Sequence, residues 1–399
     1  MYSQGNKKAL KPLKYKIAVL ATISDTIKAF YEGQFEALRQ AGINTTVICA
    51  DDPDLRNWLP VETVFIPVDL TRVISPFKDL KVICRLLKIF YKEKFDLVQY
   101  STPKAAMLAS VASFLARVPA RVYLLWGLYY QGQSGIKRTI LKLVEKITCL
   151  LSTHILPNSY EMVDVAEQDG IVRRSKCEII LNGSACGVDL EEYNPDNYKH
   201  YRAQIRNALK VPQDAVIIGV FSRLTGDKGI NEIVAAFRQI AQQLNNVFLL
   251  VIGNQEVKDW LKPETEEVLR THPKIRALGR QKTLLPYYAA IDIFCLPSYR
   301  EGFPQSPLEA QAMELPVVAT DIMGNREAVV NNQTGLLVEP RSSEALIEPL
   351  RNLISNPEMR KQMGCKGRER VKQKFDRKDV VRAIVEHRQT LLEKAKCSK

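Results

Sequence analysis

The sequence predicts an α/β protein made of two doubly wound parallel-sheet domains that face a cleft. Its 399 residues exceed what one ordinary hydrophobic core supports, so two domains are expected. Short apolar runs alternate with amphipathic segments over residues 16–157, and the alternation restarts at residue 216 after a polar, proline-containing stretch. We therefore expect an N-terminal domain over residues 1–200, a C-terminal domain over residues 201–375, and a helix over residues 376–399 that crosses back to the first domain.

The first half contains apolar runs of strand length bounded by turn residues, which is typical of buried parallel strands. A helix over residues 22–41, closed by Gly42, is expected after the first run. The predicted strands are residues 16–21, 47–50, 64–67, 96–100, 120–125 and 154–157.

Two predicted helices of the first half, residues 77–94 and 136–149, combine an apolar face with many basic residues. Each basic face is either a solvated surface or a docking surface for anionic lipid headgroups, where each positive charge contributes roughly 1 kcal/mol. Peripheral contact with an anionic membrane surface is therefore expected. The basic residues are Lys78, Lys81, Arg85, Lys88, Lys92 and Lys94 in the first helix, and Lys137, Arg138, Lys142 and Lys146 in the second.

An aromatic, glycine-containing loop follows the predicted strand at residues 120–125. Loops at the carboxyl ends of parallel strands bind ligands in open α/β sheets. Trp126, Tyr129 and Tyr130 are therefore candidates for one wall of a ligand site. The alternative is a packed loop anchored by Trp126.

The second half repeats the alternation, and its first strand ends in a glycine-bearing turn that holds Arg223 and Lys228. Two cations at the carboxyl end of a strand suit a diphosphate, which arginine binds as a fork and lysine as a point charge. The alternative, two surface cations near a helix start, is electrostatically unfavourable. The predicted strands are residues 216–221, 247–252, 275–280, 291–297, 315–320 and 335–338.

Two glutamates, Glu301 and Glu309, flank a turn that contains Gly302 and Pro304. Pro304 suits the first helical position, so Glu301 is expected in the preceding loop and Glu309 in the second helical turn. Amides at a helix start can bind an anion, and here they belong to Phe303, Gln305 and Ser306. A site that holds a phosphate near one acid and hydroxyls near the other would suit a nucleotide sugar as its ligand. The alternatives are a helix cap for Glu301 and a solvated position for Glu309.

The composition narrows the class of partner and the compartment. A net charge of +13 favours an anionic partner, and no nucleic-acid recognition motif is present, so no nucleic acid is expected. Eight scattered cysteines without a CxxC pair suit reduced thiols in the cytoplasm, and the four histidines lack the spacing of zinc ligands. No apolar run is long enough to span a bilayer, and the polar N-terminus does not read as a signal peptide.

Together these motifs resemble the retaining glycosyltransferases of the GT-B fold, and more narrowly the family 4 group that builds bacterial capsule, exopolysaccharide and lipopolysaccharide. The resemblance covers nearly the whole chain and implies two Rossmann-like domains. Residues 101–104 and 182–189 also resemble the polyprenyl-linked oligosaccharide branch. Its strongest parts are Arg223 with Lys228-Gly229, Glu301-Gly302-Phe303-Pro304 with Glu309-Ala310, and residues 316–320.

The resemblance implies that Arg223 and Lys228 bind the donor diphosphate and that Glu309 binds the ribose hydroxyls. Glu301 is implied as the catalytic residue, either a nucleophile or an electrostatic partner. Gly302, Phe303, Gln305 and Ser306 would complete the donor site. The implied reaction moves a hexose or N-acetylhexosamine, with retention, from a nucleotide sugar that is expected to be UDP-linked to a polyprenyl-diphosphate-linked saccharide acceptor. It is expected at the inner face of the cell membrane, with no cofactor and no metal.

Two positions depart from the family pattern. Trp126 stands where many members have a histidine before the glycine, and residues 22–25 replace a Gly-Gly turn. Both departures bear on the acceptor site and the first-domain phosphate contacts, and neither touches the donor half. Two alternatives stay open: a UDP-sugar epimerase of the same fold, which the scarcity of histidine near the motifs disfavours, and a non-catalytic homologue that binds nucleotide sugars.

Overall fold

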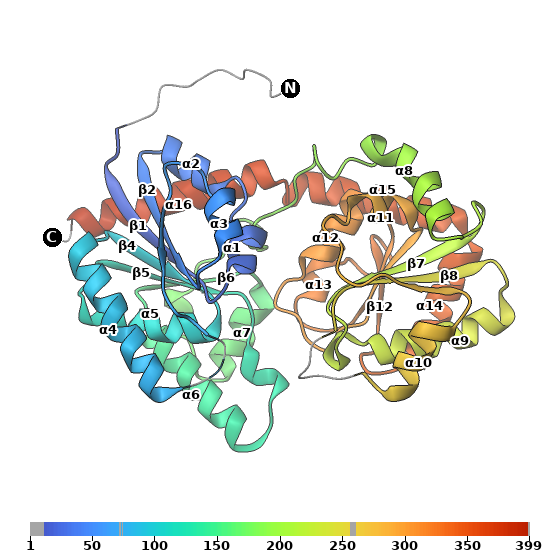
Figure 1. Ribbon diagram of the computed structural model, residues 1–399, viewed down its shortest axis with the longest axis horizontal. Coiled ribbons are helices and arrows are strands. Elements are labelled where there is room, and N and C mark those ends of the chain that lie inside the picture. Colours follow the sequence, from blue (N-terminus) through green and yellow to red (C-terminus); the bar gives the residue numbers. More distant parts are fainter. Residues whose placement is uncertain (1–11, 72, 74, 256–260, 398–399) are drawn as a thin grey trace. The chain divides into compact units, whose positions relative to one another are not determined.

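The computed structural model describes residues 12–71, 73, 75–255 and 261–397. The chain divides into two compact units, Met1–Cys186 with Lys378–Lys399, and Gly187–Arg377. The first division falls earlier than residue 200, where the N-terminal domain was expected to end. Each unit contains one six-stranded parallel sheet with helices packed against it, which confirms the predicted α/β class (Figure 1).

The sheet of the first unit has the strand order β3-β2-β1-β4-β5-β6, and all of its neighbours are parallel. Val19 of the central strand lies opposite Val47 on one side and Gln99 on the other. The strands are β1 (Tyr15–Leu20), β2 (Ile43–Cys49), β3 (Val64–Pro67), β4 (Leu97–Tyr100), β5 (Ala120–Leu125) and β6 (His154–Pro157).

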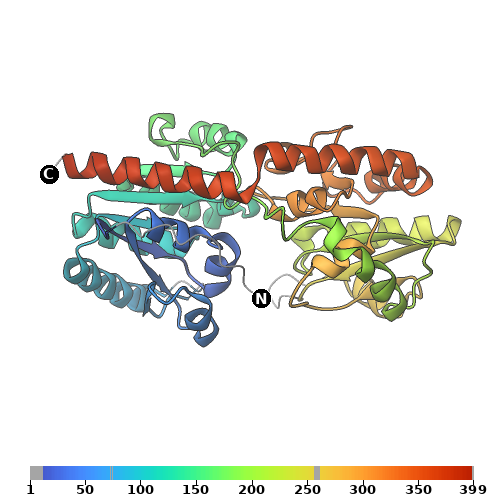
Figure 2. The ribbon, with the colours of Figure 1, turned by 90° about the horizontal axis from the view of Figure 1, so that it is seen from above.

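The last helix of the chain, α16 (Arg377–Cys397), completes the core of the first unit. Val381, Val385, Leu391 and Leu392 are buried in one cluster with the apolar side chains of β1, β2, β4, β5 and β6. Figure 2 shows this helix running along the first unit. The helix predicted over the end of the chain therefore forms, and it packs where the hydrophobic pattern of its own sequence requires burial.

The expected single helix over residues 22–41 is wrong. Two short helices form instead, α1 (Ser24–Phe30) and α2 (Gln34–Gln40). Between them Gly33 has φ 73°, a left-handed conformation that glycine adopts at little cost and that no regular helix contains. The apolar periodicity continues across this break, which is why the pattern alone indicated one helix.

Three helices of the first unit, α4, α5 and α6, pack side by side in sequence order (Figure 1). The two predicted basic helices are confirmed as α4 and α6. The remaining bounds are α3 (Pro53–Trp58), α4 (Pro76–Glu93), α5 (Pro103–Leu115), α6 (Gly135–Leu151), α7 (Tyr160–Gln168), and the 3-10 turns η1 (Tyr129–Gly132) and η2 (Arg174–Lys176).

The sheet of the second unit has the order β12-β11-β10-β7-β8-β9 and is again parallel throughout. The strand expected over residues 275–280 ends at Ala277. The strands are β7 (Val216–Phe221), β8 (Val247–Ile252), β9 (Ile275–Ala277), β10 (Ile293–Leu296), β11 (Val317–Thr320) and β12 (Gly335–Val338).

Helices cover the second sheet and bury two apolar clusters against it. They are α8 (Pro195–Ala208), α9 (Ile230–Gln243), α10 (Pro263–Thr271), α11 (Leu285–Ala290), α12 (Gln305–Ala312), α13 (Asn325–Ala328), α14 (Glu344–Ser355) and α15 (Pro357–Lys374), with the 3-10 turn η3 (Gly226–Lys228). Among the residues that the structure describes, no helix has the length and apolar character needed to cross a bilayer.

Candidate active site

The candidate site lies at one edge of the second sheet, where β7 and β10 end. These strands are parallel neighbours, so the loops that follow them leave the sheet at the same edge. The loop after β7 carries Arg223 and Lys228, and the loop after β10 carries Glu301. The sheet topology therefore gathers residues that are far apart in the sequence.

A close backbone approach joins the two loops. Gly229 has φ 69°, and a β-carbon there would lie 2.0 Å from the carbonyl oxygen of Pro297, so only glycine fits. The amide of Tyr299 also donates a hydrogen bond to the carbonyl of Asp227 at 2.8 Å. These contacts hold the turn that contains Lys228 against the strand end that leads to Glu301.

Lys228 and Glu301 form an ion pair inside this contact. The Nζ atom of Lys228 lies 2.6 Å from Oε1 of Glu301, and both side chains are mostly shielded from solvent. Lys228, which is expected to bind the diphosphate, and Glu301, which is expected to be the catalytic acid, are therefore direct neighbours. Partial burial makes the charge–charge interaction stronger than it is at an open surface.

A second acid of the site, Asp227, interacts with three cations. It forms an ion pair with Arg300, and the charges of Arg223 and Lys228 also act on it. The Arg300 guanidinium lies 2.7 Å from Oδ2 of Asp227. Burial alone would raise the pKa of Asp227, but the hydrogen bond from Thr225 and the charges of Arg300, Lys228 and Arg223 together lower it. The site therefore concentrates positive charge at the carboxyl ends of β7 and β10. Asp227 and Arg300 were not among the predicted site residues.

The turn after Glu301 packs against a third loop, the one that precedes α13. Gly324 has φ 80°, and a β-carbon there would lie 2.3 Å from the carbonyl oxygen of Gly302. Pro304 is the N-cap of α12, with extended backbone, and not its first helical residue as predicted. Its φ of −75° suits either position, and the difference is in ψ, which is 133°. The helix therefore begins at Gln305.

The other residues expected at the helix start lie in three different environments. The Phe303 ring is buried and packs against Phe375 at a centroid distance of 5.6 Å. The Nε2 atom of Gln305 donates to the carbonyl of Gly187 at 2.6 Å. The carbonyl of Ser306 accepts a 3.4 Å hydrogen bond from Tyr288. The first amides of α12 have no acceptor within the helix itself.

Glu309 lies in the second turn of α12, as expected, and is partly buried. Its Oε2 atom accepts a 2.9 Å hydrogen bond from the Tyr288 hydroxyl. Burial raises the pKa of Glu309, while the Tyr288 hydrogen bond and the charge of Arg377 act in the opposite direction. Tyr193 also donates a hydrogen bond to this carboxylate and lowers its pKa, so two tyrosines hold the Glu309 side chain in place. Tyr288 comes from α11, and its apolar flanks in the sequence gave no sign of this contact.

The three aromatic candidates of the first unit separate. Trp126 packs against Phe30 at 4.6 Å and lines a pocket of this unit. Tyr130 is buried and donates a 2.7 Å hydrogen bond to Asp169, whereas Tyr129 is exposed. Their role toward an acceptor stays a prediction.

The described residues contain no group of three or more His, Cys, Asp or Glu side chains that could hold a metal ion. The expectation that the reaction needs no metal stays a prediction. The cationic groups next to the expected diphosphate position are those of Arg223, Lys228 and Arg300.

Two domain families and a full-length relative decide what kind of protein this is. Residues 202–370 match the family of glycosyl transferases group 1, and residues 27–183 match the glycosyl transferase 4-like domain. The capsular polysaccharide biosynthesis glycosyltransferase CapM of Staphylococcus aureus is 31% identical over 360 residues, which is 90% of this chain and 93% of CapM. The chain belongs to the family 4 glycosyltransferases. The transferase domain that matches group 1 contains all of the candidate donor residues.

Further comparisons agree with the family and the fold. The transferase is 28% identical over 328 residues to the UDP-Gal:alpha-D-GlcNAc-diphosphoundecaprenol alpha-1,3-galactosyltransferase of Escherichia coli, covering 79% of this chain and 81% of that one. Its fold matches Anabaena Alr3699/HepE in complex with UDP-glucose, with a TM-score of 0.77 and 20% identity over 94% of this chain and 100% of HepE. The predicted GT-B fold of the transferase is thereby confirmed.

Proposed function

We propose that this transferase moves a hexose or N-acetylhexosamine, with retention, from a UDP-sugar to a polyprenyl-diphosphate-linked saccharide in surface polysaccharide biosynthesis. The observation that carries the proposal is the direct contact of Lys228 with Glu301 beside a cluster of cations, at the sheet edge where α/β folds bind ligands. A nucleotide sugar needs positive charge at its diphosphate and an acid near its sugar.

In this proposal Arg223 and Lys228 bind the diphosphate, and Arg300 adds to the positive field through Asp227. Glu309, held by Tyr288 and Tyr193, accepts hydrogen bonds from the ribose hydroxyls. Glu301 lies next to the donor sugar. The backbone of Gly302, Phe303, Gln305 and Ser306 surrounds the phosphate end.

The chemistry follows from where charge develops. The acceptor hydroxyl bonds to the anomeric carbon on the same face from which the diphosphate oxygen departs, so the configuration is retained, and the acceptor proton leaves with the diphosphate. Negative charge grows on the leaving group and positive charge on the sugar. Preformed cations and helix amides stabilise the first, and the carboxylate of Glu301 stabilises the second, so these groups replace a metal ion.

The substrates are proposed from relatives. The printed name of the Escherichia coli relative specifies a UDP-linked donor and an acceptor linked to diphosphoundecaprenol, and CapM is named for capsular polysaccharide biosynthesis. HepE was solved with UDP-glucose. These names support a UDP-sugar donor and a lipid-linked acceptor. From the lipid-linked acceptor we propose a place at the inner face of the cell membrane.

A membrane contact through α4 and α6 is part of the proposal. The outer face of α6 exposes Ile136, Ile140, Leu143 and Leu150 beside its basic residues, and α4 exposes Phe77, Leu80 and Tyr91. Apolar side chains mixed with lysine and arginine on one helix suit the boundary between lipid headgroups and acyl chains. This surface would bring the first unit to its lipid-linked acceptor.

The decisive experiment is a transfer assay with a panel of nucleotide sugars and a polyprenyl-diphosphate-linked acceptor. Wild type is compared with Glu309→Ala and Lys228→Ala, and with Lys199→Ala, whose exposed ion pair with Asp196 makes it a matched control. We expect transfer of one sugar, its loss in the first two variants, and no change in the control. Full activity in both site variants would refute the assignment. An epimer formed from the donor alone, or donor binding without turnover on any lipid acceptor, would favour the two alternatives.

A further inference from the structure

A small pocket lies within the first unit, between the sheet and the helices α1, α2 and α16. Its cavity of about 30 Å³ compares with the roughly 10–15 Å³ that one bound water requires by the same measure. The space therefore suits one small chemical group, and not a whole sugar ring. Polar side chains surround it, although it sits against the apolar core. They are Gln34, Gln99, Asn158, Ser184 and Arg388.

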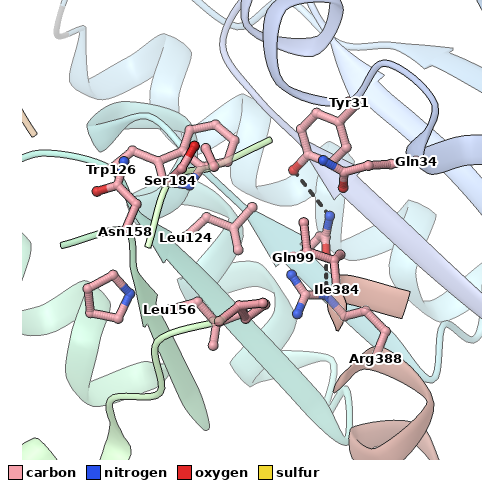
Figure 3. Close-up of a pocket in the computed structure, with 13 residues that line it drawn as sticks. Tyr31, Gln34, Gln99, Leu124, Trp126, Leu156, Asn158, Ser184, Ile384 and Arg388 are labelled. Carbon is pink, nitrogen blue, oxygen red and sulfur yellow. Dashed lines mark hydrogen bonds between the residues drawn. The ribbon is translucent and has the colours of Figure 1, made fainter. Parts of the chain in front are cut away.

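Arg388, on α16, is the charged group of this pocket and is 3% exposed. Its Nε atom donates to Oε1 of Gln99 at 2.7 Å, and the Gln99 amide donates to the Tyr31 hydroxyl at 3.1 Å. Figure 3 shows these three side chains joined in a row along one side of the pocket, with Asn158 and Trp126 on the other side in this view. The row orients the guanidinium toward the cavity.

The hydrogen-bonded partners of Arg388 are neutral. Its Nη1 atom donates to Nδ1 of His387, whose Nε2 atom lies 3.0 Å from Glu178, so the nearest bonded carboxylate is one residue removed. Burial and the charge of Arg388 lower the pKa of His387, which fits a neutral imidazole in this position. Burial also lowers the pKa of Arg388, to about 10, so the guanidinium stays charged at neutral pH.

This environment lacks the usual partner of a buried cation. Buried charges in proteins are normally paired, because an unpaired buried charge strongly destabilises the folded state. None of the residues that line the pocket is acidic. Glu178 interacts electrostatically with Arg388, but no residue that lines the cavity supplies an anion to the guanidinium.

A second group in the pocket is also incomplete. Asn158 is 4% exposed, and its Oδ1 atom has no hydrogen-bond partner among the described residues. A buried acceptor without a donor destabilises the folded state. Arg388 and Asn158 come from segments more than two hundred residues apart and face the same small cavity. One group needs an anion and the other needs a donor such as a hydroxyl.

We propose that this pocket is a subsite for an acidic substituent of the acceptor saccharide, a carboxylate or a phosphate. The guanidinium of Arg388 binds the anionic oxygens, and Oδ1 of Asn158 accepts a hydrogen bond from a neighbouring hydroxyl. The sugar ring stays outside the cavity, where Trp126 offers an aromatic surface. The identification of the ligand as the acceptor rests on the proposed function, whereas the binding of the anion does not.

The test measures binding of small probes to the intact protein by calorimetry, without donor. Glucuronate carries the carboxylate, glucose 1-phosphate carries the phosphate, and glucose carries neither. We expect at least one anionic probe to bind tenfold or more tightly than glucose, and the preferred probe identifies the anion. Arg388→Gln should abolish that preference. Arg382→Gln, on the exposed side of the same helix, should keep it. No preference in wild type, or the same preference in Arg388→Gln, overturns the subsite.

A second variant covers the case in which Arg388→Gln unfolds. Asn158→Asp is isosteric and places a carboxylate in the cavity, where it competes with any bound anion for Arg388. Anion binding should be lost in this variant while thermal unfolding is preserved, and unchanged binding would overturn the proposal. Failure of the proposed function can be told apart from failure of the subsite. Transfer activity without anion binding eliminates the subsite alone. Anion binding without transfer eliminates the transferase proposal alone.

Discussion

The Nζ atom of Lys228 lies 2.6 Å from Oε1 of Glu301, although 73 positions separate the two residues in the chain. Gly229 makes this possible, since its missing side chain lets one loop lie on the end of β10. The pair joins the group proposed to bind the donor diphosphate to the group proposed to act at the sugar. Each side chain therefore holds the other in the site before the donor arrives.

The first prediction concerns the energetic coupling of this pair. Lys228→Ala should lower kcat/KM about 10²–10³-fold, the range found when one preorganised electrostatic group is removed from an active site. Glu301→Gln should produce a loss of similar size. Because the two side chains act as a unit, the double variant should lose far less than the product of the two single effects. Steady-state kinetics of the four proteins measures this, and multiplicative losses would contradict the coupling.

The second prediction concerns Glu309 and its partner. Tyr288→Phe removes a hydrogen bond to the carboxylate, a contact worth roughly 1.5–3 kcal/mol, so UDP should bind about 10–100-fold more weakly. Burial raises the pKa of Glu309, so its protonation begins at a higher pH than that of an ordinary glutamate. UDP affinity should therefore weaken as the pH falls. Calorimetry at several pH values measures both effects, and Glu309→Gln should remove this pH dependence.

The third prediction concerns stability and Glu145, a buried acid of α6 that accepts a 2.6 Å hydrogen bond from Tyr123. Burial raises the pKa of Glu145 from 4.5 to about 7. The folded protein then binds more protons than the unfolded chain between these pH values, so this residue makes stability fall as the pH rises from about 4.5 to 7.

Glu145→Gln stays neutral, so it should gain up to about 3 kcal/mol relative to wild type between pH 4.5 and pH 8. Denaturant unfolding at both ends of this range measures the difference. Glu386→Gln changes an exposed acid in the same way and should show no such trend. A constant difference between Glu145→Gln and wild type would mean that the carboxyl is not protonated in the folded state.

The fourth prediction concerns the outer face of α6. Lys137→Glu with Lys146→Glu changes the charge by four, and each lost positive charge near an anionic surface costs roughly 1 kcal/mol. Co-sedimentation with phosphatidylglycerol-containing vesicles should therefore fall at least tenfold. Lys361→Glu with Lys372→Glu makes the same charge change on exposed positions of α15 and should have a smaller effect. Equal losses from both pairs would mean that only net charge matters.

The strands and the functional turns were predictable because their signals are local. Each strand is a continuous apolar run, and the loops with Lys228 and Glu301 lie at strand ends, where a parallel sheet gathers its loops. The break at Gly33 and the cap at Pro304 were missed because each depends on a single backbone angle, which the apolar pattern does not determine. The polar, proline-containing stretch before residue 216 contains α8, which was not predicted. An Asn194 cap begins this helix, and an ion pair between Arg206 and Asp292 anchors it.

Partners across the fold could not be read from local patterns. Tyr288 lies in an apolar run typical of a core helix, and its contact with Glu309 depends on how α11 packs on α12. Arg300 looks like any surface arginine until Asp227 is placed beside it. Arg388 is one of many basic residues in α16, yet its side chain is buried against Gln99 of a strand 289 positions earlier.

The placement of α16 has a consequence for how the protein is made. The sheet of the first unit is complete when residue 157 has been synthesised, but Val381, Val385, Leu391 and Leu392 still have to cover it. At roughly 5–20 residues per second, translation of residues 187–377 leaves that sheet uncovered for about 10–40 s. The second unit is a single uninterrupted segment of the polypeptide. It is therefore able to finish folding on the ribosome before the half that emerged first.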